Sequence, residues 1–326
     1  MTRLMIEADG LHKRYGKQVA VERVDLAVPA GTVLGVLGPN GAGKSTTIRM
    51  LTTMTRPDGG TGRVGGLDIV ARARAVRRII GVTGQDASLD DLLTGTQNLV
   101  MVGQLSKLPR RTAQARAAEL LDHFGLSEAA GRPVKTYSGG MRRRLDLAAS
   151  LVARPPVLFL DEPTTGLDPT SRQQMWAVIR RLTADGATVL LTTQYLDEAE
   201  ALADSIVVVD HGTVIATGTA SELKARIGGE HLEVTLSEPH PDAERALAPL
   251  IAGPVHTADG GRRLVAPAAP RPGLATAVIR ALDAVGAAVD DIEVHHPSLD
   301  DVFFALTGKP AAPVEAAPAA GEEVVA

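Results

Sequence analysis

A glycine-rich segment between an apolar run and a helical run constrains this chain more than any other feature. The segment extends from Gly38 to Thr46, reads GPNGAGKST, and matches the pattern G-x-x-x-x-G-K-S/T. It follows the apolar run Val33–Leu37 and precedes a helix that we expect to begin near Lys44. Glycines let backbone N–H groups converge on phosphate oxygens, and the start of the helix adds its dipole. A glycine-rich turn matches this pattern by chance in few chains, and the flanking strand and helix favour a phosphate-binding loop.

The loop indicates a nucleoside-triphosphate site in which two side chains have defined roles. Lys44 is expected to contact the β- and γ-phosphates, and the hydroxyl of Ser45 is expected to bind Mg²⁺. The predicted nucleotide contacts in the loop are Gly38, Pro39, Asn40, Gly41, Ala42, Gly43, Lys44, Ser45 and Thr46.

Two consecutive acids after a second apolar run supply the expected catalytic groups. The run Val157–Leu160 is followed by Asp161 and Glu162. Asp161 is placed to hold Mg²⁺ through its water shell, and Glu162 is placed to polarise an attacking water as a general base. Such a pair alone is more often a solvated strand end, but a phosphate-binding loop in the same chain favours the catalytic interpretation.

Ser138, Gly139 and Gly140 precede a predicted helix just upstream of these acids. Ser138 is a suitable N-cap, and the N–H groups of the two glycines would point out of the start of the helix. Alone, the segment would be read as an ordinary capped helix, but beside a phosphate-binding loop it suggests a second anion-binding helix end. We interpret the arginines from Arg142 to Arg144 as a mostly solvated face without a role in the site.

The alternation of short apolar runs with helical segments predicts an α/β core. Continuous apolar runs are typical of buried parallel strands, and they are Val33–Leu37, Ile79–Thr83, Val157–Leu160, Thr188–Thr192 and Ile206–Val209. The predicted helices are Lys44–Met54, Ala113–Phe124, Arg142–Ala153 and Ser171–Asp185. This order predicts a parallel sheet covered on both faces, with a helical insertion at about residues 94–153.

The chain changes character near Gly228 and Gly229. We expect a nucleotide-binding domain over residues 1–228 and a smaller accessory domain over residues 229–308. The predicted order of the accessory domain is β-α-β-β-α-β, which is typical of a ferredoxin-like α+β fold. Ser298 and Asp301 are spaced as a capping-box pair for a last helix. Residues 309–326 are rich in Ala, Pro and Glu and are predicted to form a disordered tail.

Charge and composition argue against several classes of protein. The net charge of −4 disfavours binding of nucleic acid through overall charge, so we expect no nucleic-acid partner. The chain contains no cysteine, which excludes disulfides and thiolate zinc sites and fits the cytosol. The longest apolar runs have the length of a strand, so we expect the chain to be soluble or peripherally attached to a membrane.

In their order along the chain, the motifs resemble those of the nucleotide-binding subunits of ABC transporters. They are the loop at Gly38–Thr46, Gln85 after a strand, Ser138-Gly-Gly, Asp161-Glu162 and Thr165-Gly-Leu-Asp168-Pro. The resemblance covers Tyr15 to Gln194. It implies a P-loop NTPase fold of the ABC ATPase type with a helical subdomain, and it implies ATP and Mg²⁺ as cofactors.

The resemblance also implies that two copies of the chain share each nucleotide. The subunits would stack head to tail as a homodimer, with ATP between the loop of one copy and the segment Ser138 to Met141 of the other. Tyr15 would stack on adenine, Gln85 would sense Mg²⁺ and the attacking water, and Asp168 would join the dimer seam.

Two positions depart from the family pattern. The signature segment normally ends in Gln, where this chain has Met141. The switch histidine of the family is replaced by Gln194, whose amide can donate to the γ-phosphate but carries no titratable charge. The context of Gln194 and the segment Pro297–Gly308 are similar to the drug-resistance exporter branch, typified by daunorubicin and doxorubicin resistance ATP-binding proteins.

The resemblance therefore implies an ATPase subunit, peripheral at the cytoplasmic face of the membrane, that powers efflux of a hydrophobic, drug-like or antibiotic compound. Its partner would be an integral membrane permease, and we expect the contact around Gln85 and residues 86–99. Two alternatives stay open. One is a soluble non-transport ABC ATPase that acts in translation or DNA repair. The other, motivated by Gln194, is an ATP-gated regulatory module with little turnover.

Overall fold

The computed structural model describes residues 3–84, 89–226, 231–268, 272–295 and 298–307, and the chain divides into two compact units. The division lies between Ala220 and Ser221, whereas the sequence predicted a boundary after residue 228. Most of helix α8 (Ala220–Arg226) therefore belongs to the second unit. The predicted disordered tail lies outside the described residues.

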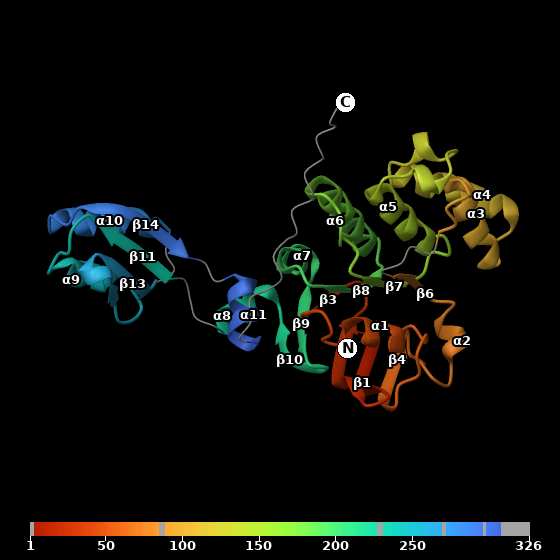
Figure 1. Cartoon of the computed structure of the whole chain (residues 1–326), viewed down its shortest axis with the longest axis horizontal. Helices are drawn as coiled ribbons and strands as arrows, with labels where there is room; N and C mark the ends of the chain where they lie inside the picture. Colours follow the sequence, from red (N-terminus) through yellow and green to blue (C-terminus); the bar gives the residue numbers. More distant parts are fainter. Residues whose placement is uncertain (1–2, 85–88, 227–230, 269–271, 296–297, 308–326) are drawn as a thin grey trace, which may run out of the picture. The chain divides into compact units, whose positions relative to one another are not determined.

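Within the described residues, the first unit holds a ten-stranded sheet with the order β5-β4-β1-β2-β10-β9-β3-β8-β7-β6 (Figure 1). Neighbours in its second half, from β9 to β6, pair in parallel. These strands are β9 (Ser205–Asp210), β3 (Val33–Leu37), β8 (Thr188–Thr193), β7 (Val157–Asp161) and β6 (Ile80–Thr83). They are the strands predicted from the apolar runs, and every residue of β3, β7 and β8 is buried, as parallel strands covered on both faces require.

The prediction of a parallel sheet is wrong for the other strands, apart from one parallel bridge between two of them. These are β1 (Leu4–Tyr15), β2 (Gln18–Pro29), β4 (Gly59–Val64), β5 (Leu67–Asp68) and β10 (Thr213–Gly218). They pair antiparallel along β5-β4-β1-β2 and between β10 and β9, and the parallel bridge joins β10 to β2. In β2, buried Val24, Leu26 and Val28 alternate with exposed residues, because an antiparallel sheet can leave one face in water.

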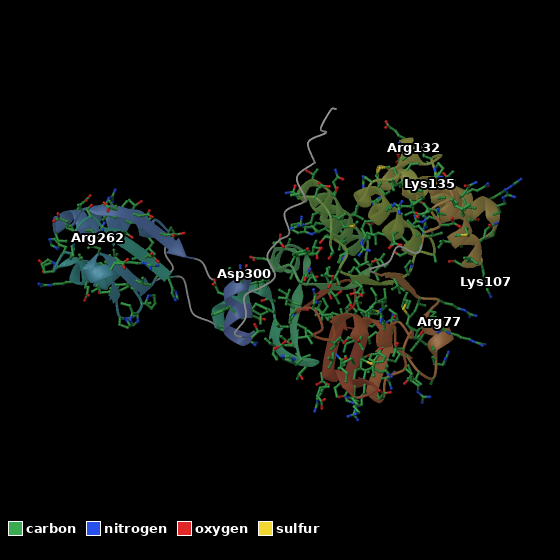
Figure 2. The ribbon with its side chains drawn as sticks, viewed as in Figure 1. Arg77, Lys107, Arg132, Lys135, Arg262 and Asp300 are labelled. Atoms are coloured by element: carbon green, nitrogen blue, oxygen red, sulfur yellow. The ribbon has the colours of Figure 1, made fainter. Side chains whose placement is uncertain are left out.

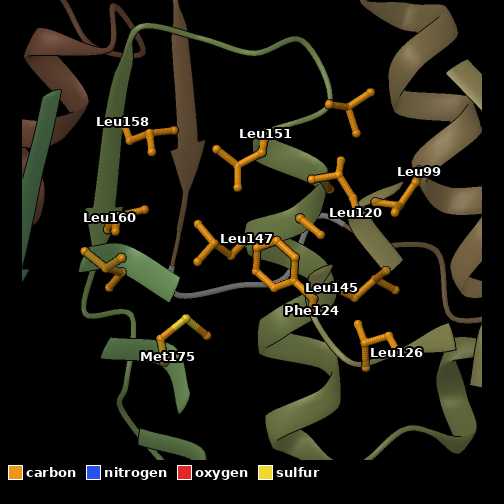
Figure 3. Close-up of a cluster of buried hydrophobic side chains, with 14 of the residues drawn as sticks. Leu99, Leu120, Phe124, Leu126, Leu145, Leu147, Leu151, Leu158, Leu160 and Met175 are labelled. Carbon is orange, nitrogen blue, oxygen red and sulfur yellow. The ribbon is translucent and has the colours of Figure 1, made fainter. Parts of the chain in front are cut away.

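The central strands separate two hydrophobic cores. Alternate residues of β7 enter opposite cores: Leu158 and Leu160 pack with α3, α4 and α5 (Figure 3), whereas Val157 and Phe159 pack with α1, β1 and β2. Figure 1 shows α5 and α6 on one side of the central strands and α1 on the other. The helices of this unit are α1 (Lys44–Leu51), α2 (Ala73–Val76), α3 (Gly95–Leu105), α4 (Arg110–His123), α5 (Gly139–Ser150), α6 (Pro169–Ala184) and α7 (Leu196–Leu202).

The second unit has the predicted β-α-β-β-α-β order. Its elements are β11 (His231–Leu236), α9 (Ala243–Leu247), β12 (His256–Ala258), β13 (Arg263–Pro267), α10 (Leu274–Ala284) and β14 (Val289–His295). The strand order is β12-β13-β11-β14 with antiparallel neighbours, which is the ferredoxin-like arrangement. The last helix, α11 (Leu299–Thr307), begins with the predicted capping box, since Asp301 N donates to Ser298 Oγ and Ser298 N to Asp301 Oδ2.

Charged side chains such as Arg77, Lys107, Arg132 and Lys135 are exposed on the first unit (Figure 2). Across the described ranges, no helix combines the length and hydropathy that a bilayer crossing needs.

Candidate functional site

The loop from Gly38 to Thr46 joins β3 to α1 and packs closely against neighbouring strands. A Cβ atom at Gly38 would lie 2.2 Å from the carbonyl oxygen of Val209. Gly43 has a φ of 103°, and a Cβ there would lie 2.6 Å from the carbonyl oxygen of Ala20. Only glycine fits both positions, so these residues set the path of the loop.

Lys44 lies in the first turn of α1, and only 4% of the residue is exposed. Its ammonium donates to the carbonyl oxygens of Gly38 at 2.7 Å and Pro39 at 3.2 Å, and Nζ lies 3.5 Å from Glu162 Oε1. Burial lowers the pKa of Lys44, and the negative charges of Glu162 and Asp161 oppose that shift. The loop therefore encloses a cation whose two carbonyl contacts can be exchanged for phosphate oxygens.

Asp161 ends β7, where parallel pairing with β8 places it opposite Thr192. Its Oδ1 accepts from Thr192 Oγ1 at 2.5 Å and from Ser45 Oγ at 3.1 Å. The structure thus brings together two of the predicted Mg²⁺ ligands. A carboxylate and a hydroxyl are hard oxygen donors of the kind that Mg²⁺ prefers, so this pair fits the metal.

Glu162 follows in a turn with an unusual backbone. Its φ of 49° lies in the left-handed region, which costs about 1–2 kcal/mol for a residue with a side chain. The backbone N–H donates to both the carbonyl and the hydroxyl oxygen of Thr192, each at 3.1 Å. The carboxylate accepts from Thr165 Oγ1 at 3.3 Å and is nearly buried. Strain of this kind persists where surrounding contacts hold it, and it concentrates at functional sites.

A pocket of about 830 Å³ opens over these groups, and this volume lies in the roughly 300–1,000 Å³ range of ligand sites. The predicted residues that line it are Tyr15, Pro39, Asn40, Gly41, Gly43, Lys44, Ser45, Thr46, Gly139 and Glu162. Thr165, Gly166 and Leu167 also line it, and they belong to the motif before Asp168, in which a role was predicted for Asp168 alone. The sequence missed the other lining residues, which are Gln18, Ala20, Arg142 and Arg143. Gly38, Ala42 and Asp161 are buried and do not line it.

Tyr15 ends β1 and is 45% exposed at the pocket. The Nζ of Lys13 lies 5.4 Å from the centre of its ring, a cation–π distance. Gln18 pairs with Tyr15 across the turn between β1 and β2, which explains why it reaches the same pocket. Recognition of this hairpin in the sequence would have predicted Gln18.

The signature segment caps α5 as predicted. Ser138 Oγ accepts from Met141 N at 3.3 Å, and Ser138 and Gly139 are exposed. Among the described residues, Ser138, Gly140 and Met141 do not line the pocket of their own chain.

Two further predicted residues, Asp168 and Gln194, do not line the pocket. Asp168 caps α6 and accepts from Ser171 N at 2.9 Å and from Ser171 Oγ at 2.6 Å, and these bonds lower the pKa of Asp168. Gln194 directly follows β8 and is half-buried, but it does not line the pocket in the described structure. Gln85 lies outside the described residues.

The interpretation of Arg142 to Arg144 as a mostly solvated face is wrong. Arg142 pairs with Asp91 at 3.0 Å, Arg143 donates to four carbonyl groups, and Arg144 Nη1 donates to the carbonyl of Phe124 at 3.0 Å. Residues 145–149 of α5 are all buried. Because the helix is covered on every side there, the arginines in the turn just before are also partly covered.

A family model described as ABC transporter matches residues 21–165 of this chain. The daunorubicin/doxorubicin resistance ATP-binding protein DrrA of Streptomyces peucetius is 53% identical over 324 residues, which cover 98% of each chain. The chain belongs to the ATP-binding subunits of ABC transporters. A doxorubicin resistance ATP-binding protein of Mycobacterium tuberculosis (strain CDC 1551 / Oshkosh) is 45% identical over 94% of this chain and 95% of that protein. A solved ATP-binding subunit of an ABC transporter shares a TM-score of 0.62 and 28% identity over 68% of this chain and 92% of that structure.

Family membership confirms the predicted P-loop fold of the ABC ATPase type. It also confirms the predicted enzymatic activity, which is ATP hydrolysis coupled to transport. The resemblance to the drug-resistance branch is confirmed by the two resistance proteins, which match nearly the whole chain.

Proposed function

We propose that this chain powers the efflux of a hydrophobic, drug-like compound through a separately encoded membrane permease. The observation that carries the ATPase part is the placement of the Glu162 carboxylate 3.5 Å from Lys44 in one pocket. The choice of a drug rests on the relatives, whose names specify resistance to daunorubicin and doxorubicin.

The catalytic step follows from the residues of the pocket. Lys44 binds the β- and γ-phosphates in place of the carbonyls that it now contacts, and Tyr15 stacks on the adenine. Glu162 orients a water and accepts its proton as the oxygen attacks the γ-phosphorus. The bond from the γ-phosphorus to the bridging oxygen breaks, and ADP and phosphate leave.

Ser45 and Asp161 would hold Mg²⁺, since both oxygens meet at the edge of the loop. When bound, the metal would neutralise negative charge on the β- and γ-phosphates. Gln85, the third predicted ligand, lies outside the described residues.

The signature segment completes the site of a second copy in a homodimer. Ser138 and Gly139 are exposed, and first-turn N–H groups of a helix have no acceptor within it. Such groups bind phosphate well. Met141 replaces the usual Gln at the end of this segment, and Asp168, exposed at the start of α6, joins the seam between copies.

Gln194 provides a neutral contact to the γ-phosphate. It lies two residues beyond Thr192, the residue that bonds both catalytic acids. Its amide donates a hydrogen bond but cannot gain charge as the pH falls. The chain works as a peripheral subunit at the cytoplasmic face of the membrane, with its permease contact around Gln85 and residues 86–99.

Glu162→Gln tests this function, because the amide keeps the shape of the carboxylate but cannot act as a base. We expect phosphate release to fall roughly 10²–10⁴-fold, with ATP binding preserved and an ATP-dependent dimer trapped in size-exclusion chromatography. Glu128→Gln, at an exposed glutamate of the same unit, is the matched control and should keep wild-type turnover. Wild-type turnover in Glu162→Gln would remove Glu162 from its role.

The transport part is tested by co-expression of this chain with a candidate permease, which is sought in the neighbouring open reading frame. Inside-out vesicles that contain both proteins should accumulate daunorubicin with ATP, and vesicles with Glu162→Gln should not. Association of the chain with ribosomes and not with membranes would support the non-transport alternative. Absence of Mg²⁺-dependent phosphate release beside the permease would support the regulatory one.

A further inference from the structure

One arginine outside the predicted site holds the backbone that carries the catalytic carboxylate. Arg143 lies on α5, and its guanidinium donates through Nη2 to the carbonyl oxygens of Asp161 at 2.9 Å and Glu162 at 2.7 Å. Its Nε donates to the carbonyl oxygen of Pro163 at 2.9 Å. Three consecutive carbonyls of the catalytic turn, Asp161–Pro163, therefore accept from one planar group.

The same guanidinium reaches the neighbouring strand. Its Nη1 donates to the carbonyl oxygen of Gly84 at 2.6 Å, and Gly84 directly follows β6, which pairs with β7. Arg143 therefore joins the carboxyl ends of two parallel strands. A lysine could not do this, because its ammonium is a point charge without the planar fork of five N–H donors.

The charge of Arg143 is suited to this place. Burial lowers its pKa, while Asp146, Asp161, Glu198 and Glu162 face it and raise the pKa. A guanidinium stays protonated across the physiological range, so it remains a permanent cation among these acids. Replacement by a neutral side chain would leave the acids without that charge and the four carbonyls without their donor.

The backbone of Glu162 is held from both sides. Its N–H is bonded to Thr192 on β8, and its carbonyl is bonded to Arg143 on α5. Together these contacts stabilise the left-handed φ of 49°, which fixes the direction of the carboxylate.

We propose that Arg143 is a positioning residue that aims Glu162 and links it to the signature helix of its own chain. The proposal rests on the proposed role of Glu162 as the general base. α5 begins at the signature segment, which in the proposed homodimer binds the nucleotide of the other copy. A shift of α5 at one nucleotide would then move the base at the other, and Arg143 would couple the two ATP sites.

The test compares Arg143→Gln and Arg143→Lys with Arg144→Gln. Arg144 is the matched control, since it lies next on the same helix and donates to the carbonyl of Phe124 instead of the catalytic turn. A misplacement of about 1 Å can cost on the order of 100-fold in rate, so we expect Arg143→Gln to lower kcat at least about ten-fold. The Kd for ATP should stay within about two-fold, because the loop contacts are untouched. Arg143→Lys should restore only part of kcat.

A merely structural role would lower the melting temperature and kcat together in both glutamine variants. Equal loss of kcat in Arg143→Gln and Arg144→Gln would therefore overturn the proposal. So would a weakened Kd for ATP at unchanged kcat.

A double-mutant cycle separates this proposal from the function on which it rests. In the Glu162→Gln background, Arg143→Gln should reduce the residual turnover by less than about two-fold, because residues that act through one group are not additive. A full ten-fold loss in that background would show that Arg143 acts independently of Glu162. If Glu162→Gln loses turnover and Arg143→Gln does not, only the positioning role fails. If Glu162→Gln keeps turnover, the proposed function fails first.

Discussion

Thr192 connects the two catalytic acids, and removal of its hydroxyl tests that connection directly. Its Oγ1 donates to Asp161 Oδ1 at 2.5 Å and accepts from Glu162 N at 3.1 Å, and the residue is completely buried. Thr192→Val keeps the shape of the side chain and removes both bonds. Glu162 N keeps the carbonyl of residue 192 as an acceptor at 3.1 Å, so the main loss is the bond to the carboxylate.

The expected cost follows from the charge of that acceptor. A hydrogen bond to a charged group contributes about 1.5–3 kcal/mol, so the free energy of unfolding of the first unit should fall by that amount. Thr188→Val is the matched control on the same strand. Thr188 is equally buried, but its Oγ1 accepts from the neutral N–H of Gly31 at 2.9 Å, and such a bond contributes about 0.5–1.5 kcal/mol.

Urea unfolding followed by tryptophan fluorescence measures both variants. Trp176 is the single tryptophan of the sequence and packs against the core of the first unit, so its emission reports on that unit. The midpoint should fall further for Thr192→Val than for Thr188→Val, with the same m value. Equal costs for the two variants would refute the view that Thr192 acts mainly through a charged bond to Asp161.

Two further variants test single features of the structure. Trp176 Nε1 donates to Glu198 Oε1 at 3.2 Å, and burial raises the pKa of Glu198 above that of the unfolded chain. The stability that this carboxyl contributes is complete below its unfolded pKa and is lost as the pH rises through its folded pKa. Glu198→Gln should therefore stabilise the first unit at pH 8 relative to its effect at pH 4. Thermal unfolding at the two pH values measures this difference. Gly38→Ala should weaken ATP binding at least about ten-fold in equilibrium titrations, because the new Cβ would lie 2.2 Å from the carbonyl oxygen of Val209 and the loop must move. Gly131→Ala, which adds a Cβ in open space, should leave ATP binding unchanged.

The central strands could be predicted and the antiparallel ones could not, for a reason visible in β1. A buried parallel strand is apolar at every position, so β3, β7 and β8 stand out without knowledge of register. An antiparallel strand is recognised by a period of two, and irregularities break that period. The pairing of β1 with β2 shifts between Ala8 and Leu11, where Gly10 adopts a φ of 58°. The alternation therefore changes phase within β1, and no single pattern covers it.

The phosphate-binding loop could likewise be predicted from the sequence, whereas the role of Arg143 could not. Phosphate binding by a loop depends on local backbone geometry, so spacing along the sequence is enough to predict Gly38–Thr46. The role of Arg143 depends on carbonyl groups of Gly84 and of Asp161–Pro163, which only the packing of α5 against two strand ends brings within reach. Three consecutive arginines look alike in a sequence, and nothing local indicates which one faces the sheet.

The catalytic turn, Asp161–Pro163, is bonded to two elements: β8, which leads to Gln194, and α5, which begins at the signature segment. Thr192 on β8 lies two residues before Gln194, and Arg143 on α5 lies five residues after Ser138. A nucleotide bound to the loop alone would leave both supports of Glu162 in place. A nucleotide that also contacts Gln194 and the signature segment of a second copy would act on β8 in one chain and on α5 in the other. The direction of the Glu162 carboxylate would then depend on occupancy of both sites, so hydrolysis would be favoured in the closed dimer over the single subunit.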